Sequence, residues 1–370
     1  MSELPGVSII VVNYNNERFL ATAIDSALCQ SHPSCEVIVV DDCSTDNSRA
    51  VIERYGDRIR IILQEQNGGQ TAALNTAWPL ARYPILIFLD SDDVLLPHAA
   101  ATVASRWTAA TVKTQSPLIT IDKEGRQIGH IAPKYPPNLD TATLRRALLR
   151  TGSCLVSPSS GNACSRALLE VITDDDGFDV ENPREMWMDL ILECNAPFYG
   201  EVVTIYEPLA CYRIHDSNGF CTSSMNIDKP QFEKVYRYFT NRLDYFAGRC
   251  RVWNIAFDQV AARNRSIWGL ESRLVADKLA SSSNPPADPI WRTLVRAIKA
   301  CSNAELPLSN RITRVAWFVG VAISPRAVAT WLIKLRFMVT ERPAWFERVL
   351  WTIVNISGWR GSPRSKATPR

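Results

Sequence analysis

The most informative segment of the chain reads Ile85-Leu86-Ile87-Phe88-Leu89-Asp90-Ser91-Asp92-Asp93. Its apolar run is typical of a buried strand, and three carboxylates follow where that strand leaves the core. Side chains at i and i+2 of an extended segment project to one side, so Asp90 and Asp92 can face a hard divalent cation. Mg²⁺ and Mn²⁺ prefer such oxygen ligands and commonly bridge carboxylates to phosphates. Taken alone, the same residues also fit a solvated turn before a helix that starts near Leu96-Pro97.

The segments before this acidic turn alternate between two hydrophobic periods. Four apolar runs predict strands, at residues 7–12, 37–40, 59–63 and 85–89. Helical spacing predicts a helix over residues 17–30 and another that ends at Glu53. Strands that alternate with helices of this length indicate a parallel sheet between helical layers, in which ligands bind at the carboxyl ends of the strands.

Polar clusters fall at each of those strand ends. They are Asn13-Tyr14-Asn15-Asn16, Asp41-Asp42, Gln66-Asn67-Gly68-Gly69-Gln70 and the acidic turn 90–93. Tyr14 can stack on a base, and Asp41 or Asp42 can accept from a base imide or a ribose hydroxyl. Each residue also has a simpler explanation, because a loop tyrosine is often a packing residue and paired Asp is a common turn signal.

The loop after the first predicted strand argues against one class of nucleotide enzyme. A dinucleotide oxidoreductase would share the alternating α/β pattern, but it needs Gly-x-Gly-x-x-Gly at this position. This chain carries Asn13-Tyr14-Asn15-Asn16 there instead. The sequence therefore argues against a dinucleotide-binding dehydrogenase.

The order of these motifs resembles a known family. Residues 7–97, with Asn-Tyr-Asn, Asp-Asp-x-Ser-Thr-Asp, Asn-Gly-Gly-Gln and Asp-Ser-Asp-Asp, look like the nucleotide-sugar-binding half of family 2 glycosyltransferases of the bacterial polysaccharide and cell-envelope type. The resemblance implies a GT-A fold, which is a three-layer α/β/α sandwich, followed here by a mainly helical C-terminal extension. It also implies a nucleotide-diphosphate sugar donor and Mn²⁺ or Mg²⁺.

The resemblance also implies roles for the rim residues. Tyr14 stacks on the nucleobase, Asp42 or Asp41 bonds the base, and residues 90–93 bind ribose and the metal that holds the diphosphate. Asp90 is the ribose candidate and Asp92 is the first candidate for the metal ligand. The register of these roles varies within the family, so Asp93 stays a second candidate for the metal.

One position departs from the family's pattern. Many members carry Arg-Asn-x-Gly in the helix after the glycine loop, where this chain reads Leu74-Asn75-Thr76-Ala77. A contact from that Arg to phosphate or ribose would be missing. Gln70 and Asn75 are candidates to replace it, and Asn67 joins them among the predicted donor-binding residues. The exposed N–H groups of a helix N-terminus could also favour phosphate without a side chain.

The second half of the domain is expected to supply the acceptor site and the catalytic base. An inverting transfer needs a carboxylate that takes the proton of the attacking hydroxyl, and a cation that stabilises the departing diphosphate. The segment Glu185-Met186-Trp187-Met188-Asp189 resembles the family's acidic helix, in which many members have Glu-Asp or Ala-Asp at 188–189. Asp189 is the predicted base, and Glu185, one turn earlier, is the alternative. A surface carboxylate paired with an Arg is the simpler explanation of Asp189.

A Tyr-Arg-x-His motif at residues 212–215 completes the resemblance. In that context His215 is predicted to be a third metal ligand or a phosphate contact, although an isolated loop histidine is usually only solvated. A catalytically inactive scaffold that binds nucleotide sugar stays open as an alternative function, because Asp189 has an atypical neighbour.

The C-terminal part of the chain is basic and rich in tryptophan. Residues 241–370 contain 21 Lys and Arg against 8 Asp and Glu, although the whole chain has a net charge of only +3. Eight of the eleven tryptophans lie there, namely Trp253, Trp268, Trp291, Trp317, Trp331, Trp345, Trp351 and Trp359. Aromatic rings interleaved with Arg are typical of a bilayer interface, and no apolar run in this part reaches spanning length.

These features predict attachment to an anionic membrane surface, which would bring the active site to a glycan or lipid-linked acceptor. The alternative is a helical subdomain that docks on the catalytic sheet or forms a homodimer. No recognised nucleic-acid module accompanies the basic residues, so nucleic acid is not a predicted partner.

Domain bounds and location follow from the remaining composition. We expect a catalytic domain over 1–225, with the donor half at 1–110 and the acceptor half at 111–225, and a helical region over 226–370. Ten cysteines without a close Cys-x-x-Cys pair favour a reduced setting and argue against structural zinc. The N-terminus lacks the pattern of a signal peptide, so the prediction is a cytoplasmic protein, peripheral at the inner face of the plasma membrane.

Overall fold

The structure is a computed structural model that describes residues 4–174, 187–215, 218, 229–280, 289–304 and 306–337. The described residues form two compact units. The first falls within residues 1–224 and 238–263, and the second within 225–237 and 264–370. The predicted domain bounds, 1–225 and 226–370, stay a prediction.

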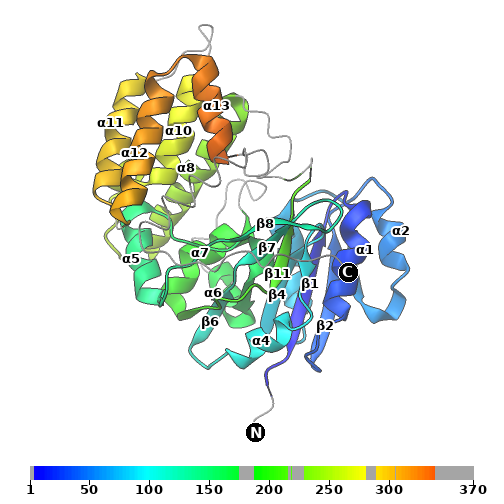
Figure 1. Cartoon of the computed structure of the whole chain (residues 1–370). Coiled ribbons are helices and arrows are strands. Elements are labelled where there is room, and N and C mark those ends of the chain that lie inside the picture. The colour runs from blue at the N-terminus through cyan, green and yellow to red at the C-terminus, as the bar shows by residue number, and fades with distance from the viewer. Residues whose placement is uncertain are drawn as a thin grey trace, which may run out of the picture. The chain divides into compact units, whose positions relative to one another are not determined.

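The N-terminal half follows the strand and helix alternation predicted from the sequence. Its elements are β1 (Val7–Asn13), α1 (Glu17–Leu28), β2 (Cys35–Asp41), α2 (Ser48–Glu53), β3 (Arg60–Leu63), α3 (Gln70–Ala77) and β4 (Ile85–Asp90). Figure 1 shows β1 and β2 beside α1 and α2. The apolar runs of β1, β2 and β4 become mostly buried strands, as expected for parallel strands covered by helices on both faces, whereas β3 is partly exposed.

Two sheets organise the first unit. Within the described residues the larger sheet has the order β10-β6-β9-β4-β1-β2-β3, in which β1 pairs in parallel with β2 and β4, and β9 pairs antiparallel with β4 and β6. The smaller sheet has the order β5-β11-β7-β8. The strands not yet given bounds are β5 (Val94–Leu95), β6 (Thr111–Gln115), β7 (Leu118–Ile121), β8 (Gln127–Ala132), β9 (Asn162–Ser165), β10 (Glu201–Thr204) and β11 (Ala210–Arg213).

The large sheet has a hydrophobic core on each face. Ile9 and Val11 of β1 pack on one face with α1 and α4 (Ala99–Ser105). Ile10 and Val12 pack on the other face with α3, α5 (Thr141–Thr151), α6 (Arg166–Asp174) and α7 (Met188–Tyr199). Alternate residues of a strand point to opposite faces, so one strand serves both cores. The predicted three-layer α/β/α sandwich is confirmed.

The rest of the described chain is helical, as predicted. Its helices are α8 (Lys229–Val252), α9 (Gln259–Arg265), α10 (Ile267–Leu279), α11 (Ile290–Ser302), α12 (Leu308–Ile323) and α13 (Arg326–Phe337). In the second unit α10, α11, α12 and α13 enclose a core that includes Leu274, Ala297, Phe318 and Ile333. None of the described helices combines the length and apolar character that a membrane crossing needs.

Candidate active site

Asp41 stabilises the loop that follows β2. Its carboxylate is fully buried and accepts hydrogen bonds from Asn13 Nδ2 (2.8 Å), Ser44 N (3.0 Å), Ser44 Oγ (2.5 Å) and Arg49 Nε (3.2 Å). Four donors on one carboxylate satisfy a buried charge that would otherwise be costly. Ser44, the serine of the Asp-Asp-x-Ser motif, therefore has a structural role and joins the β2 loop to the β1 loop.

Asp42 holds the glycine loop. One of its carboxylate oxygens accepts from Gly68 N and the other from Gly69 N, both at 2.8 Å. Asn67 Nδ2 donates to the Asp42 carbonyl oxygen at 3.2 Å. Gly69 has a φ of 86°, a conformation that favours glycine, and directly precedes α3. The structure thus brings the predicted residues Asp42 and Asn67 together at the ends of β2 and β3.

Tyr14 is presented to solvent by a strained neighbour. Asn15 adopts a left-handed φ of 53° and is held there because its Oδ1 accepts from Thr45 N at 2.7 Å and its N–H donates to Ser44 Oγ at 2.9 Å. Tyr14 is 46% exposed at the tip of this turn. An exposed ring on a fixed backbone suits a stacking surface.

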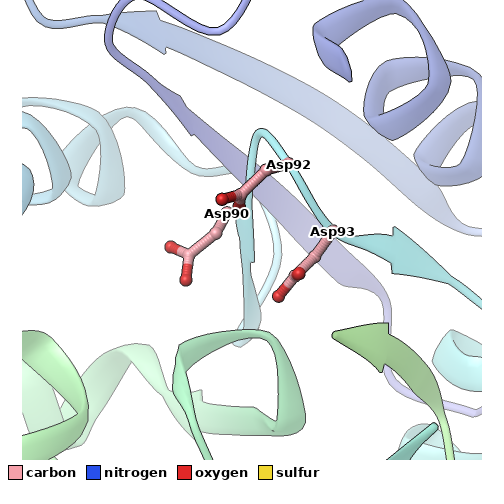
Figure 2. A group of neighbouring side chains, drawn as sticks. All are labelled: Asp90, Asp92 and Asp93. Atoms are coloured by element: carbon pink, nitrogen blue, oxygen red, sulfur yellow. The ribbon is translucent and has the colours of Figure 1, made fainter. Parts of the chain in front are cut away.

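The acidic turn places three carboxylates together. Asp90 lies at the end of β4, and Asp92 and Asp93 lie on the turn after it (Figure 2). One oxygen from each carboxylate lies within 4.8 Å of the others. Burial, followed by repulsion from Asp92 and Asp189, raises the pKa of Asp90 to about 8. Burial, followed by repulsion from Asp92 and Asp90, raises the pKa of Asp93 well above its ordinary value. A hard divalent cation would offset this repulsion, so the donor set fits Mg²⁺ or Mn²⁺.

The Tyr-Arg-x-His segment returns to this turn. Arg213 N donates to Asp93 Oδ1 at 2.9 Å, and Arg213 Nε donates to the Asp92 carbonyl oxygen at 2.7 Å. His215 Nε2 lies 2.9 Å from Asp92 Oδ2. Asn218 Oδ1 accepts from His215 N at 2.6 Å, which holds the histidine in place. The two halves of the first unit therefore meet at the acidic turn.

Gln70 and a serine turn complete the support of these carboxylates. Gln70 Nε2 donates to Asp90 Oδ1 at 2.6 Å and to Ser159 Oγ at 3.3 Å. Ser160 Oγ donates to Asp93 Oδ2 at 2.6 Å and accepts from Asp90 N at 3.1 Å. Gln70 thus reaches the site through Asp90.

Asp189 lies in the first turn of α7, where its Oδ1 accepts from Leu190 N at 2.8 Å. Burial, followed by repulsion from Glu193, raises its pKa to about 6, and Lys113 and Arg242 counteract this rise. The charge of Asp189 also contributes to the raised pKa of Asp90, so the two carboxylates act on each other electrostatically. A carboxylate with such a pKa can accept a proton near neutral pH. Glu185, the alternative base, lies outside the described residues.

Comparison with known proteins identifies the family. The model of the family described as Glycosyl transferase family 2 matches residues 8–171. An uncharacterized glycosyltransferase of Nostoc sp. is 32% identical over 281 residues, which cover 71% of this chain and 84% of that protein. This chain belongs to glycosyl transferase family 2. The resemblance predicted from the sequence motifs is confirmed, and the chain is a glycosyltransferase.

Two further proteins show how far the likeness to other glycosyltransferases extends. Over 93 residues this family 2 chain is 39% identical to the Escherichia coli enzyme named UDP-Glc:alpha-D-GlcNAc-diphosphoundecaprenol beta-1,3-glucosyltransferase WfgD. The matched residues cover 25% of this chain and 37% of WfgD. The mannosyltransferase PcManGT from Pyrobaculum calidifontis, solved in complex with GDP-Man and Mn²⁺, aligns over 95% of this chain and 88% of its own, with a TM-score of 0.50 and 15% identity. The predicted GT-A fold is confirmed.

Sequence reasoning missed part of the support that this family 2 enzyme gives its acidic turn. The residue types of Ser157-Pro158-Ser159-Ser160-Gly161-Asn162 indicate only a turn. No local signal shows that Ser159 and Ser160 reach residues 70 and 93. Asn75, a predicted donor contact, accepts from Trp78 Nε1 at 3.3 Å on the next turn of the chain, and its role in donor binding stays a prediction.

Proposed function

We propose that this family 2 glycosyltransferase is inverting and divalent-metal-dependent, and that it moves a sugar from a nucleotide-diphosphate donor to an acceptor hydroxyl in polysaccharide or cell-envelope glycan synthesis. The observation that carries the proposal is the meeting of the acidic turn with His215, while Asp189 is near enough to perturb the pKa of Asp90. These residues supply a cation site and a base at one end of the sheet.

The donor would lie along the carboxyl ends of β1, β2 and β4. Tyr14 stacks on the base, and Asp42 accepts from the base in the proposed complex, after some of its contact with the Gly68 and Gly69 amides is given up. Asp90 bonds the ribose, and Asn67 and Gln70 keep the loop and Asp90 in place. The proposal leaves Asp41 a structural role, because four donors already satisfy its carboxylate.

Asp92 and His215 are the proposed metal ligands. When bound, the cation supplies positive charge to the departing diphosphate. Asp93 has both carboxylate oxygens engaged by Ser160 and Arg213, so the proposal gives it the role of an anchor for the turn.

Asp189 is the proposed base of an inverting displacement. Its carboxylate takes the proton of the acceptor hydroxyl while that oxygen attacks the anomeric carbon from the face opposite the diphosphate. The bond from the anomeric carbon to the diphosphate oxygen breaks, and the leaving nucleoside diphosphate keeps its electron pair. One displacement inverts the configuration at that carbon.

The acceptor is proposed to be lipid-linked. Support comes from WfgD, whose name gives a nucleotide-sugar donor and a diphosphoundecaprenol-linked acceptor, although this chain matches only 37% of its length. The second unit carries exposed Trp291 and Trp331 with exposed Arg292, Lys299 and Lys334. Such residues suit attachment to an anionic surface at the inner face of the plasma membrane. Trp345, Trp351 and Trp359 lie outside the described residues.

Vesicle flotation tests the membrane part of the proposal. The full chain is expected to float with vesicles that contain anionic lipid but not with neutral ones, and Trp291→Ala/Trp331→Ala is expected to reduce flotation. Failure to float together with a dimer in solution would favour the homodimer instead.

The melting temperature of the purified protein tests the donor part. It is measured with nucleoside diphosphates and their sugars, each with Mn²⁺, Mg²⁺ or EDTA, because a ligand that binds the native state raises the melting temperature. A metal-dependent rise with one nucleotide would name the donor base. Asp189→Asn should keep that rise and lose turnover, whereas unchanged transfer by Asp189→Asn would reject the assigned base.

A further inference from the structure

A short 3-10 turn from the second half of the first unit, Ser159–Gly161, supports the acidic turn. Its central residue, Ser160, is 2% exposed and has its hydroxyl between the two ends of residues 90–93. The hydroxyl donates to Asp93 Oδ2 at 2.6 Å and accepts from Asp90 N at 3.1 Å. One hydroxyl therefore joins the first and the last residue of the acidic turn.

The bond to Asp93 has the length of a charge-assisted hydrogen bond, which is about 2.5–2.7 Å for a hydroxyl on a carboxylate. Arg213 N occupies the other Asp93 oxygen at 2.9 Å. With both oxygens engaged, Asp93 fixes the end of the turn. Asp92 lies between the two fixed residues, and its carboxylate faces His215.

The serine turn itself has little freedom to shift. A Cβ on Gly161 would lie 2.0 Å from Ser157 Oγ and 2.7 Å from the Ser116 carbonyl oxygen, so the backbone packs closely there. Asn162 Nδ2 also donates to the carbonyl oxygens of Ser157 and Pro158, at 2.8 Å each. A rigid turn can hold the Ser160 hydroxyl at one place.

We propose that Ser160 is a positioning residue of the metal site, because its hydroxyl holds Asp93 against Asp90 and so sets where Asp92 meets a divalent cation. This inference rests on the proposed metal dependence. Groups that orient metal ligands typically change metal affinity by about 10–100-fold when removed. Ser160→Ala is therefore expected to weaken Mn²⁺ binding by about that factor.

Mn²⁺ titration of the full chain, followed by the electron paramagnetic resonance of free Mn²⁺ in the presence of UDP or GDP, tests the inference. Ser157→Ala is the matched control, because Ser157 is fully buried in the same segment and its hydroxyl donates to the Ser116 carbonyl oxygen at 2.5 Å. Ser160→Ala removes its hydrogen bonds to Asp93 and Asp90, and Ser157→Ala removes its hydrogen bond to Ser116, so urea unfolding of each variant accompanies the titration. Only Ser160→Ala should lose Mn²⁺ affinity.

A double-mutant cycle separates the proposed route from a general loss of packing. If Ser160 acts through Asp93, then Ser160→Ala should have little further effect on Mn²⁺ affinity in an Asp93→Asn background. Fully additive effects would overturn that route. Equal Mn²⁺ affinity for Ser160→Ala and Ser157→Ala would overturn the inference alone, whereas no Mn²⁺ binding by the unaltered chain would overturn the proposed metal dependence and this inference with it.

Discussion

His215 Nε2 lies 2.9 Å from Asp92 Oδ2, although 123 residues separate the two along the chain. Both side chains are largely buried, and Phe19 packs against the imidazole at a ring distance of 4.8 Å. A carboxylate oxygen and an imidazole nitrogen held this close can share a divalent cation.

His215→Ala should therefore weaken metal-dependent nucleotide binding. We expect a loss of about tenfold or more in Mn²⁺ affinity, since a proposed ligand should matter at least as much as a group that only orients one. Calorimetric titration with Mn²⁺ and UDP or GDP would measure it. His32→Ala is the control, because His32 is also buried but contacts the Pro5 carbonyl oxygen away from the turn. Equal affinities in the two variants would remove His215 from the metal site.

The pH dependence of transfer should report Asp189. Burial raises its pKa to about 6, and the proposed base works only when ionised. The rate should therefore fall as the pH drops below about 6, which gives the pH profile an acidic limb. An ordinary aspartate would place this acidic limb at about pH 4. A kcat profile at saturating donor and metal would show it. A limb near the ordinary value would contradict the assignment.

Lys113 should influence the pH at which the acidic limb of the rate profile falls. Its ammonium is buried on β6, where burial lowers its own pKa to about 8, and its positive charge helps to lower the pKa of Asp189. Lys113→Met should move the acidic limb of the profile to higher pH. Lys299→Met, an exposed substitution in the second unit, should leave the limb in place.

The raised pKa of Asp189 also determines how its contribution to the free energy of unfolding depends on pH. Because the folded state binds the Asp189 proton more tightly than the unfolded chain does, this group favours folding at low pH, and that contribution is lost as the pH rises through about 6. Asp189→Asn should then be at least as stable as the unaltered chain at pH 7. Urea unfolding at pH 7 would show whether lost turnover comes from chemistry or from misfolding.

Tyr14 offers a test of the donor base. Removing a stacked ring typically costs about 1–3 kcal/mol, so Tyr14→Ala should weaken nucleotide binding about 5- to 150-fold. Tyr14→Phe keeps the ring and should bind nearly as well as the unaltered chain. Because the side chain is 46% exposed, neither change should alter the melting temperature of the free protein much. Equal affinity in Tyr14→Ala would place the base elsewhere.

A buried ion pair should make the core behind Asp189 sensitive to substitution. Arg242 Nη1 lies 3.1 Å from Glu193 Oε2, and Glu193 also accepts from Cys154 N at 2.6 Å. Arg242→Met leaves a buried carboxylate without this cation and should cost about 3–5 kcal/mol of unfolding free energy. The double variant Arg242→Met/Glu193→Gln should recover part of the loss in urea unfolding.

The sequence predicted the fold well where hydrophobic period decides the element. The strands from Val7 to Leu89 and the polar clusters at their ends follow from local patterns, because a parallel sheet brings its carboxyl ends to one edge. It could not separate Asp41 from Asp42. Their difference depends on which neighbours surround each carboxylate, namely Ser44 and Arg49 for Asp41 and the glycine amides for Asp42.

The links that the serine turn makes to the acidic turn and to Gln70 could not be predicted. Ser160 reaches Asp93, and Gln70 reaches Ser159, only because β4 and β9 are neighbours in the sheet. Such tertiary contacts leave no period or spacing in the chain. A single sequence therefore finds the carboxylates of this site more readily than the groups that hold them.

The longest described helix, α8, belongs to both compact units, since residues 229–237 fall in the second and residues 238–252 in the first. Phe246 and Cys250 fill a core with Leu148 and Cys194, and Arg242 neutralises Glu193. A transferase truncated after residue 225 would therefore expose that core and leave Glu193 without its cation. The shortest fragment that we expect to fold as an independent enzyme extends to residue 263.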